Sequence, residues 1–578
     1  MSSNFFKFFN IFANLGKTVV MSKFINDLKK IFLYTPSATS YNFSLPETYL
    51  PQTDNGTPEN VSNLPIVTSL DENLTHLKVK YNALINSDII LREFTLNLNG
   101  TSYKSLIVCI DGMINSELVN NFLLRPLMES SNSSTKTISR NGIKIKKSKK
   151  IDLATYISNS LVPQNDINKV NNLDDLIDSV NSGDCALLVD TLDVAFIVDV
   201  KGYKAREISA PTNEIVIRGS QEAFVEKLRT NTSMLRRIIN SENLIIEDCT
   251  VGKISKTNIA ICYLKNIANS DLVNEVKYRI NNLAIDYVIS SGQLEQLIQD
   301  KSNVAFPQLI ATERSDKASL HILEGRVVVI VDGSPYVLIM PGVFLDFLSS
   351  PEDMNLKHQY SNLLKLIRFL ATFITLLLPG IYVAVSNYHT ELLPTELLFT
   401  IAASRNTVPF PSIVEIFIME VSFELLREAG LRVPTPFGST IGIIGTLVLG
   451  ESAVSANLVS PILIIIVAIT GICSFTIPDF SLSFSFRIFR FLYIVLGYLC
   501  GLLGIAMGIF IHLAILVNLK SFGAPYLAPY VPATNLNASL SYFIKPIWAR
   551  ETRADFLNTK RPKQEEKFSR KWKFWERM

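Results

Sequence analysis

Apolar segments follow one another through residues 363–519, whereas residues 1–353 have the mixed composition of a water-soluble protein. About 20 consecutive apolar residues cross the hydrocarbon core of a bilayer. With 578 residues the chain is too long for one hydrophobic core. The sequence therefore predicts an α/β soluble region followed by an all-α multi-span membrane domain. This division restricts the function to receptors, channels, transporters and membrane-bound assembly factors.

The membrane domain is predicted over residues 353–530. Its hydropathy predicts four spans, at about 363–385, 437–456, 459–478 and 490–518. The last span carries Gly497, Gly501, Gly504 and Gly508, which favour close contact between helices. An even number of spans places both chain ends on one side. The basic tail, residues 531–578, suits the cytoplasmic surface.

Residues 395–430 do not fit a simple span and predict an amphipathic or re-entrant segment. On a helix of 3.6 residues per turn, Glu420, Glu424, Arg427 and Glu428 share one stripe. Acids at bilayer depth are typical of ion or substrate paths. The alternative is an interfacial helix that lies flat on the membrane.

Two further acids join the ion-path candidates. Glu415 lies off the stripe and requires a partner of its own. Glu451 lies within the second predicted span, where it either lines a wet cavity or is a packed, hydrogen-bonded acid.

The soluble region contains a hidden duplication. A hairpin pattern is followed by residues 115–120 (Asn-Ser-Glu-Leu-Val-Asn), and a second hairpin pattern by residues 269–274 (Asn-Ser-Asp-Leu-Val-Asn). Each hexapeptide opens a helix that Ser or Asn can cap. The repeat predicts two related α/β subdomains with mixed sheets, at 69–210 and 241–352.

A connecting helix is predicted at 211–240, capped by Ser220. Its polar residues are candidates for coupling or gating between the subdomains, because arginines can clamp carboxylates or phosphates. These candidates are Arg218, Glu222, Glu226, Arg229, Asn231 and Arg236. The alternative is a structural bridge whose arginines pair with neighbouring acids.

The remaining segments contain no candidate functional residues. Residues 1–34 predict an amphipathic N-terminal arm, and residues 35–68 a flexible linker. The six cysteines have no metal-site spacing and indicate reduced thiols. The five histidines form no catalytic arrangement, and no phosphate-binding glycine loop is present, so we expect neither an enzyme nor a cofactor or metal site. The net charge of +3 gives no reason to expect nucleic-acid binding.

Motifs in both regions resemble those of the A subunit of GerA-type spore germination receptors. The soluble motifs are 193–195 (Asp-Val-Ala), 201–203 (Lys-Gly-Tyr), Arg206, Pro211, Glu214, 217–219 (Ile-Arg-Gly), 222–224 (Glu-Ala-Phe), 228–231 (Leu-Arg-Thr-Asn) and Arg236. The membrane motifs are 403–405 (Ala-Ser-Arg), 408–411 (Val-Pro-Phe-Pro), 423–430 (Phe-Glu-Leu-Leu-Arg-Glu-Ala-Gly), 440–443 (Thr-Ile-Gly-Ile), 450–454 (Gly-Glu-Ser-Ala-Val) and 459–461 (Val-Ser-Pro). Glu451 departs from the glutamine expected in many members.

The resemblance implies a multi-pass protein of the spore inner membrane, with its soluble region and tail on the core side. It implies a transporter-like B subunit and a lipoprotein C subunit as partners, contact with membrane lipid, and a homo-oligomeric ring. It also implies that germinant binding by a partner opens a path for monovalent cations. The alternative is a stage V sporulation-type paralogue, an accessory or assembly factor for ion or dipicolinate release.

Overall fold

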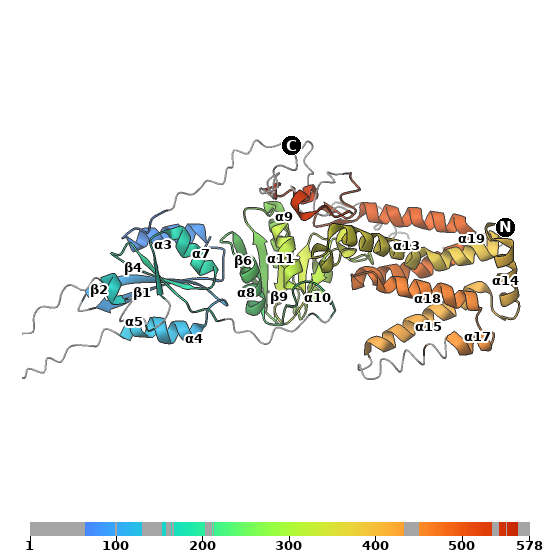
Figure 1. The fold of residues 1–578 in the computed structure, drawn as a ribbon, viewed down its shortest axis with the longest axis horizontal. Helices are drawn as coiled ribbons and strands as arrows, with labels where there is room; N and C mark the ends of the chain where they lie inside the picture. Colours follow the sequence, from blue (N-terminus) through green and yellow to red (C-terminus); the bar gives the residue numbers. More distant parts are fainter. Residues whose placement is uncertain are drawn as a thin grey trace, which may run out of the picture.

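The computed structural model describes residues 64–98, 101–129, 153–157, 163, 167–202, 211, 213–432, 445, 450–533, 543–550 and 552–564. The predicted N-terminal arm and nearly all of the predicted linker lie outside these residues. Two α/β subdomains and a helical region follow one another along the long axis (Figure 1). This order agrees with the predicted division between a soluble and a helical part.

The two subdomains share one strand topology. The first sheet has the order β1-β2-β4-β5-β3, and the second has the equivalent order β6-β7-β9-β10-β8. The first sheet comprises β1 (Ile89–Leu98), β2 (Thr101–Ile110), β3 (Ile167–Val170), β4 (Cys185–Val189) and β5 (Ala195–Val198). The second comprises β6 (Leu244–Val251), β7 (Thr257–Leu264), β8 (Ile310–Thr312), β9 (Val327–Val331) and β10 (Val337–Met340).

Every strand pair in these two sheets is antiparallel, so the predicted mixed sheets are wrong. The physical reason is connectivity, because β1 and β2, and likewise β6 and β7, are joined as hairpins, which can only pair antiparallel. Each sheet therefore consists of two hairpins with a fifth strand, β3 or β8, at one edge.

The duplicated hexapeptides begin equivalent helices. The Asn115 side chain accepts a hydrogen bond from the Glu117 amide (3.0 Å) at the start of α4 (Ser116–Leu118), which continues as η1 (Val119–Leu124) and α5 (Arg125–Glu129). The Asn269 side chain accepts one from the Asp271 amide (2.9 Å) at the start of α9 (Ser270–Asn281). The asparagine of each repeat is therefore the N-cap. The other helices of the two subdomains are α3 (Leu70–Lys80), α6 (Leu153–Tyr156), α7 (Leu173–Asn181), α8 (Leu228–Ile238), α10 (Ser291–Ile298) and α11 (Ser315–Leu323).

The predicted connecting helix is shorter than expected. Helix α8 begins at Leu228 rather than after Ser220, because the preceding residues adopt extended pairing with the second subdomain. The Phe224 amide donates to the Glu313 carbonyl (2.7 Å), and Ala223 forms a bridge with Arg314. Leu228 and Leu235 lie in the core of the second sheet. Helix α8 is therefore part of the second subdomain, where it precedes β6 as α3 precedes β1.

The helical region contains two helices, among the described residues, that are long and apolar enough to cross a bilayer: α13 (His358–Tyr388) and α19 (Phe480–Asn518). Helix α18 (Pro461–Phe475) is apolar but has only 15 residues. Most of the predicted span 437–456 lies outside the described residues. The four predicted spans are thus not confirmed. The remaining helices are α14 (Thr395–Arg405), α15 (Ser412–Arg432) and α17 (Ala453–Ser455).

Helix α19 is a hairpin and not one continuous span. Gly501 has φ +63° and ψ −146°, and the chain reverses there. The rings of Phe489 and His512 lie 4.8 Å apart, although a straight helix would separate these residues by about 34 Å. The single span predicted at 490–518 is therefore corrected to the end of one arm and the whole of a returning arm.

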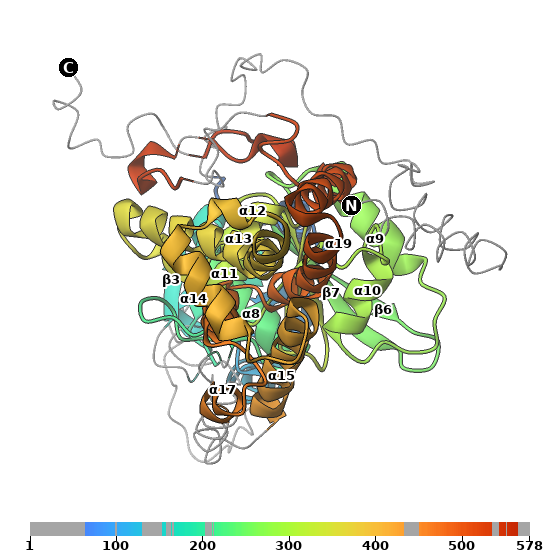
Figure 2. The same ribbon diagram turned by 90° about the vertical axis from the view of Figure 1, so that its right-hand side faces the viewer.

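Glycines bring the helical arms together, as the sequence predicted for this run. A Cβ atom at Gly497 would lie 2.5 Å from the carbonyl oxygen of Gly380 in α13, and one at Gly504 or Gly508 would crowd Leu496 in the facing arm. Seen from the helical end, α13 lies beside α19 (Figure 2). The close approach depends on residues that lack a side chain.

The described part of the tail contacts the second subdomain, an arrangement that the prediction of a basic tail on the membrane surface did not include. The Lys560 amide donates to the Ile267 carbonyl (3.0 Å), and the Arg553 side chain donates to the Leu323 carbonyl (2.9 Å). Phe556 and Leu557 are buried with Val343. The short elements around this contact are α12 (Phe344–Phe347), η4 (Pro351–Met354), β11 (Lys520–Ser521), β12 (Ala524–Pro525), η7 (Ile547–Ala549) and η8 (Asp555–Leu557), whereas η5 (Thr390–Leu392) follows α13 at its other end.

Candidate functional site

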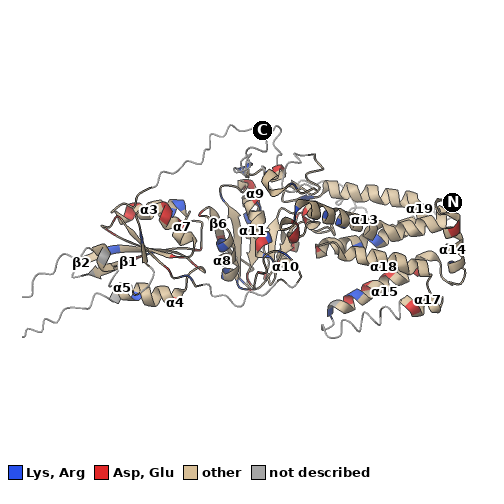
Figure 3. Cartoon of the chain, viewed as in Figure 1, with Lys and Arg blue, Asp and Glu red and all other residues tan. Residues whose placement is uncertain are grey.

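The polar residues of α15 meet arginines of α19 inside the helical region. Glu420 and Arg490 are both fully buried, and their charged groups approach to 2.8 Å. Figure 3 shows that α18 and most of α19 carry little charge, whereas α15 carries both signs. An unpaired charge in such surroundings is costly, so a buried carboxylate requires a cationic partner.

Glu424 is the centre of the arrangement. Its carboxylate accepts hydrogen bonds from Arg487 Nη1 (3.1 Å), Arg490 Nη2 (3.1 Å) and Arg427 Nη1 (3.4 Å). The side chain is 26% exposed, so it lies at the edge of the cluster while Glu420 lies at its buried end. We call Glu420, Glu424, Arg427, Arg487 and Arg490 the α15–α19 charge cluster.

Aromatic rings flank the arginines of this cluster. The Arg427 guanidinium lies 4.5 Å from the Phe475 ring centre and 5.1 Å from that of Phe423, and its Nη2 donates to Ser474 Oγ (2.5 Å). The Arg487 guanidinium lies 4.9 Å from the Phe484 ring centre. Cation–π contacts of this kind stabilise a guanidinium where water is scarce.

The other predicted ion-path residues are not part of the cluster. Glu415 is buried and accepts a hydrogen bond from the Ser460 amide (2.5 Å), which places its charge at the N-terminus of α18. Glu428 is exposed and pairs with Arg432 (2.6 Å). Glu451 is exposed, next to α17. The structure thus brings together Glu420, Glu424 and Arg427 and separates the remaining three.

Sequence reasoning missed Arg487 and Arg490 as partners of the acids. Their spacing of three residues, in a segment with no other charged residue from Ser481 to Cys500, was the available signal, since two arginines one turn apart on a largely apolar helix require acids nearby.

In the soluble region, α8 holds the two subdomains together through its arginines. Arg236 forms a two-pronged pair with Asp88, with Nε and Nη2 each 2.8 Å from a carboxylate oxygen, and both side chains are almost completely buried. Arg229 lies between Asp111 of the first subdomain (3.4 Å) and Asp248 of the second (2.8 Å). These arginines satisfy neighbouring acids, which agrees with the structural-bridge alternative.

The other candidates near α8 have local partners. Asn231 is buried and exchanges hydrogen bonds with the Val225 backbone (2.8 and 2.6 Å). Glu222 pairs with Arg237. The Gly333 amide donates to the Glu226 carbonyl (2.7 Å), and Arg218 is exposed. Only Arg229 and Arg236 of the six candidates therefore pair with acids of the first subdomain in the contacts that the structure describes.

The second subdomain joins the helical region through a shared core. Phe306 stacks on Phe489 at 5.2 Å, and Arg326 and Asp346 form a fully buried pair at 2.6 Å. Beside this junction, burial and, second to it, the nearby charge of Asp479 raise the pKa of the Glu295 carboxyl to about 7. Among the described residues no group of three or more His, Cys, Asp or Glu side chains could hold a metal ion.

These features define a class: a duplicated, antiparallel α/β region joined to an apolar helical region that contains buried ion pairs. The family model described as Bacillus/Clostridium GerA spore germination protein matches residues 75–556. The chain therefore belongs to the GerA spore germination protein family, as the motifs predicted.

Named relatives agree with this assignment. The chain is 35% identical over 494 residues to spore germination protein KA of Bacillus subtilis (strain 168), covering 85% of this chain and 87% of that protein. It is 40% identical over 353 residues to spore germination protein A1 of the same organism, covering 61% and 73%. It is also 36% identical over 495 residues to the uncharacterized membrane protein YfkQ, covering 86% and 92%.

Among solved structures, the chain is similar to the N-terminal domain of the A subunit of the Bacillus megaterium spore germinant receptor GerK3. The identity is 31%, the match covers 48% of this chain and 97% of that domain, and the TM-score is 0.36.

Proposed function

We propose that this chain is the A subunit of a nutrient-responsive germination receptor in the spore inner membrane. The chain matches 87% of spore germination protein KA and 92% of spore germination protein B1 of Bacillus subtilis (strain 168), which supports a role in germination. In this proposal it acts with a transporter-like B subunit and a lipoprotein C subunit. The B subunit binds the germinant, and the A subunits assemble into a ring that conducts monovalent cations.

The observation that carries the conduction step is the α15–α19 charge cluster. Two acids and three arginines lie between helices of an apolar bundle, where ionic groups are typical of ion paths and gates. Within one subunit the acids are paired with arginines, which corresponds to a closed arrangement. We infer that germinant binding shifts α15 against α19, so that Glu424, at the partly exposed edge, leaves its arginines and faces the path.

Replacing Glu424 by Gln tests this proposal. The amide keeps the shape but removes the charge that three arginines contact. We expect the rate of germinant-triggered potassium release from spores to change by at least about tenfold. A change of this size corresponds to a coupling energy of about 1–2 kcal/mol. Glu428→Gln is the matched control, because that carboxylate lies on the same helix but pairs only with exposed Arg432 in the contacts described.

Unchanged potassium release by Glu424→Gln spores, at normal receptor abundance, would contradict the proposed path. The accessory-factor alternative predicts a different pattern, in which spores lacking the B-type and C-type partners retain the contribution of this chain to ion release.

A further inference from the structure

The α15–α19 charge cluster carries a surplus positive charge. It contains two glutamates and three arginines, and all three arginine side chains are at most 8% exposed. Residues 433–450, which follow α15, contain no charged residue that could balance it. The acids closest in sequence, Glu415 and Glu428, have contacts elsewhere with the Ser460 amide and Arg432. A net charge held in apolar surroundings is costly unless a counter-charge joins it.

Several buried donors in the cluster also have no acceptor. Arg490 Nε, Arg490 Nη1 and Arg427 Nε are buried, with no hydrogen-bond partner among the described residues. The two guanidinium groups are neighbours, because Arg427 Nη1 and Arg490 Nη2 both contact the same oxygen of Glu424. Buried donors of charged groups are almost always satisfied, so these atoms point to an acceptor outside the described residues.

Aromatic contacts alone do not satisfy these groups. The rings of Phe423, Phe475 and Phe491 contact the arginines as cation–π partners. An N–H group, however, lies in the plane of the guanidinium and requires an acceptor at its edge. Glu424 already accepts from three arginines, and Glu420 contacts Arg490 through Oε2 and Nη2, so one further negative group balances the surplus charge and accepts from donors that the two glutamates leave unpaired.

We propose that the α15–α19 charge cluster binds one small monovalent anion of halide type, held by Arg427 and Arg490. Such an ion supplies the missing negative charge and accepts from one unpaired donor of each arginine, since Arg490 Nε and Nη1 lie on different edges of the guanidinium. Both carboxylate oxygens of Glu420 are likewise buried without a hydrogen-bond partner among the described residues, although Oε2 lies 2.8 Å from Arg490 Nη2, so we expect water to accompany the anion. This inference concerns binding in the resting protein and holds whether or not the bundle conducts cations.

The test uses the purified full-length chain in lipid nanodiscs. Sodium bromide replaces sodium gluconate at constant ionic strength, and thermal unfolding and the broadening of the chloride NMR line are followed. We expect the unfolding midpoint of the wild type to rise saturably with bromide, and bromide to reverse the line broadening of chloride. A wild type that responds equally to both salts, with no saturable step, overturns the proposal.

Substitutions at Arg427 and at Glu424 should change halide binding in opposite directions. Arg427→Gln removes the surplus charge and a donor, so the saturable step should disappear, whereas Arg427→Lys keeps the charge and should retain a weakened step. Glu424→Gln raises the surplus from one charge to two and should tighten halide binding by about tenfold. Arg432→Gln, in the exposed pair with Glu428, should leave the halide affinity unchanged. Weaker halide binding by folded Glu424→Gln also overturns the proposal.

Discussion

At the scale of single residues, Arg236 is the clearest structural anchor, because it and Asp88 join the two subdomains in a buried, two-pronged pair. Removing one partner leaves the other charge buried and unpaired, which costs about 3–5 kcal/mol. We expect Arg236→Gln to lower the thermal unfolding midpoint of the purified chain by roughly 10 °C. Arg237→Gln, whose pair with Glu222 is about one-third exposed, is the control and should cost less than about 1 kcal/mol. Equal midpoints for the two variants would contradict the anchoring role.

Glu295 makes stability depend on pH. Its pKa rises from 4.5 in the unfolded chain to about 7 in the folded protein, so the folded state holds a proton that the unfolded state releases between these values. The contribution of this proton to the free energy of unfolding is therefore complete below pH 4.5. It is lost as the pH rises through 7, and the loss amounts to about 3 kcal/mol. We expect the thermal unfolding midpoint of Glu295→Gln to decrease less between pH 5 and 8 than that of the wild type. Glu72→Gln, on the exposed face of α3, should leave the slope unchanged.

The residues of the charge cluster illustrate what spacing can and cannot predict. Glu420, Glu424 and Arg427 were assigned to one face because residues three and four apart on a helix lie on the same side. Their partners lie 63 and 66 residues from Glu424, in another helix. Such a pairing depends on how two helices pack, which the periodicity of either helix does not contain. The sequence therefore predicted that these residues share one face of a helix, but not that arginines of another helix pair with the acids.

At the scale of elements, the turn of α19 depends on Gly501. Its φ of +63° and ψ of −146° lie in a region that is essentially restricted to glycine, and a Cβ atom there would lie 3.0 Å from His389 Nε2. We expect Gly501→Ala to destabilise the hairpin by about 1–3 kcal/mol, measured as a lower unfolding midpoint. Gly430→Ala lies in α15 with open space around it and should be neutral or stabilising by up to about 1 kcal/mol. A neutral Gly501→Ala would show that the turn does not require this conformation.

The elements of the two α/β subdomains were predicted better than those of the helical region. The repeated hexapeptides and hairpin patterns led to two related subdomains, because capping and alternation are local properties. The strand order shares this duplication. The start of α8 was wrong because the Phe224 amide pairs with the Glu313 carbonyl, 89 residues away in sequence, instead of entering the helix. The reversal at Gly501 was not predicted, because a run of apolar residues indicates that a segment is buried in lipid or protein. It does not indicate where the chain turns.

At the scale of the whole molecule, one hydrophobic core continues from the second sheet into the helical region. Ile246 and Ile330 of that sheet belong to the same buried cluster as Phe306, Phe486 and Tyr493. The Arg326–Asp346 pair and the docked tail lie close to the same junction. We therefore expect a displacement of α19 to be transmitted to the second subdomain, and through the arginines of α8 to the first. This continuity links the two α/β subdomains to the helical region through buried contacts.

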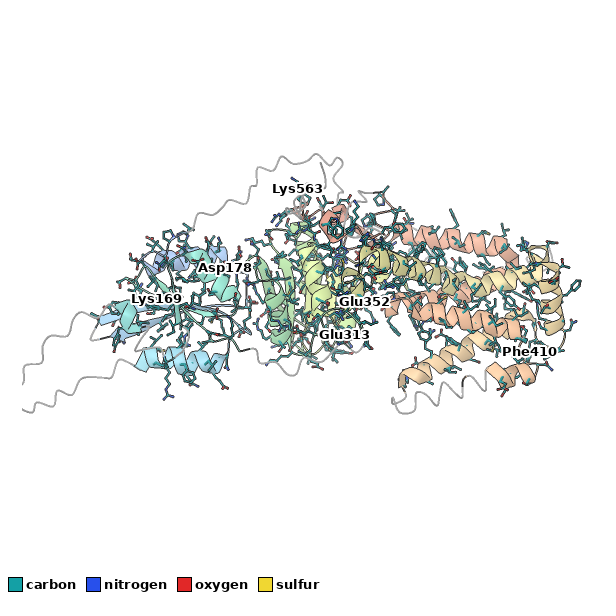
Figure 4. The ribbon with its side chains drawn as sticks, viewed as in Figure 1. Lys169, Asp178, Glu313, Glu352, Phe410 and Lys563 are labelled. Atoms are coloured by element: carbon teal, nitrogen blue, oxygen red, sulfur yellow. The ribbon has the colours of Figure 1, made fainter. Side chains whose placement is uncertain are left out.

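The path of the chain also predicts the topology. Helix α13 leaves the second subdomain and the last arm of α19 returns to it, where Lys301 Nζ donates to the Asn518 carbonyl (3.4 Å). Phe410 lies at the opposite end of the helical region from Glu352, and Lys563 lies beside the soluble region (Figure 4). In a cysteine-free background, we expect Phe410→Cys to react with an impermeant maleimide only from outside the cell. Lys563→Cys should react only in inverted vesicles, because a bilayer of about 30 Å separates the two positions. Labelling of both from the same side would contradict a membrane placed across α13 and the two arms of α19.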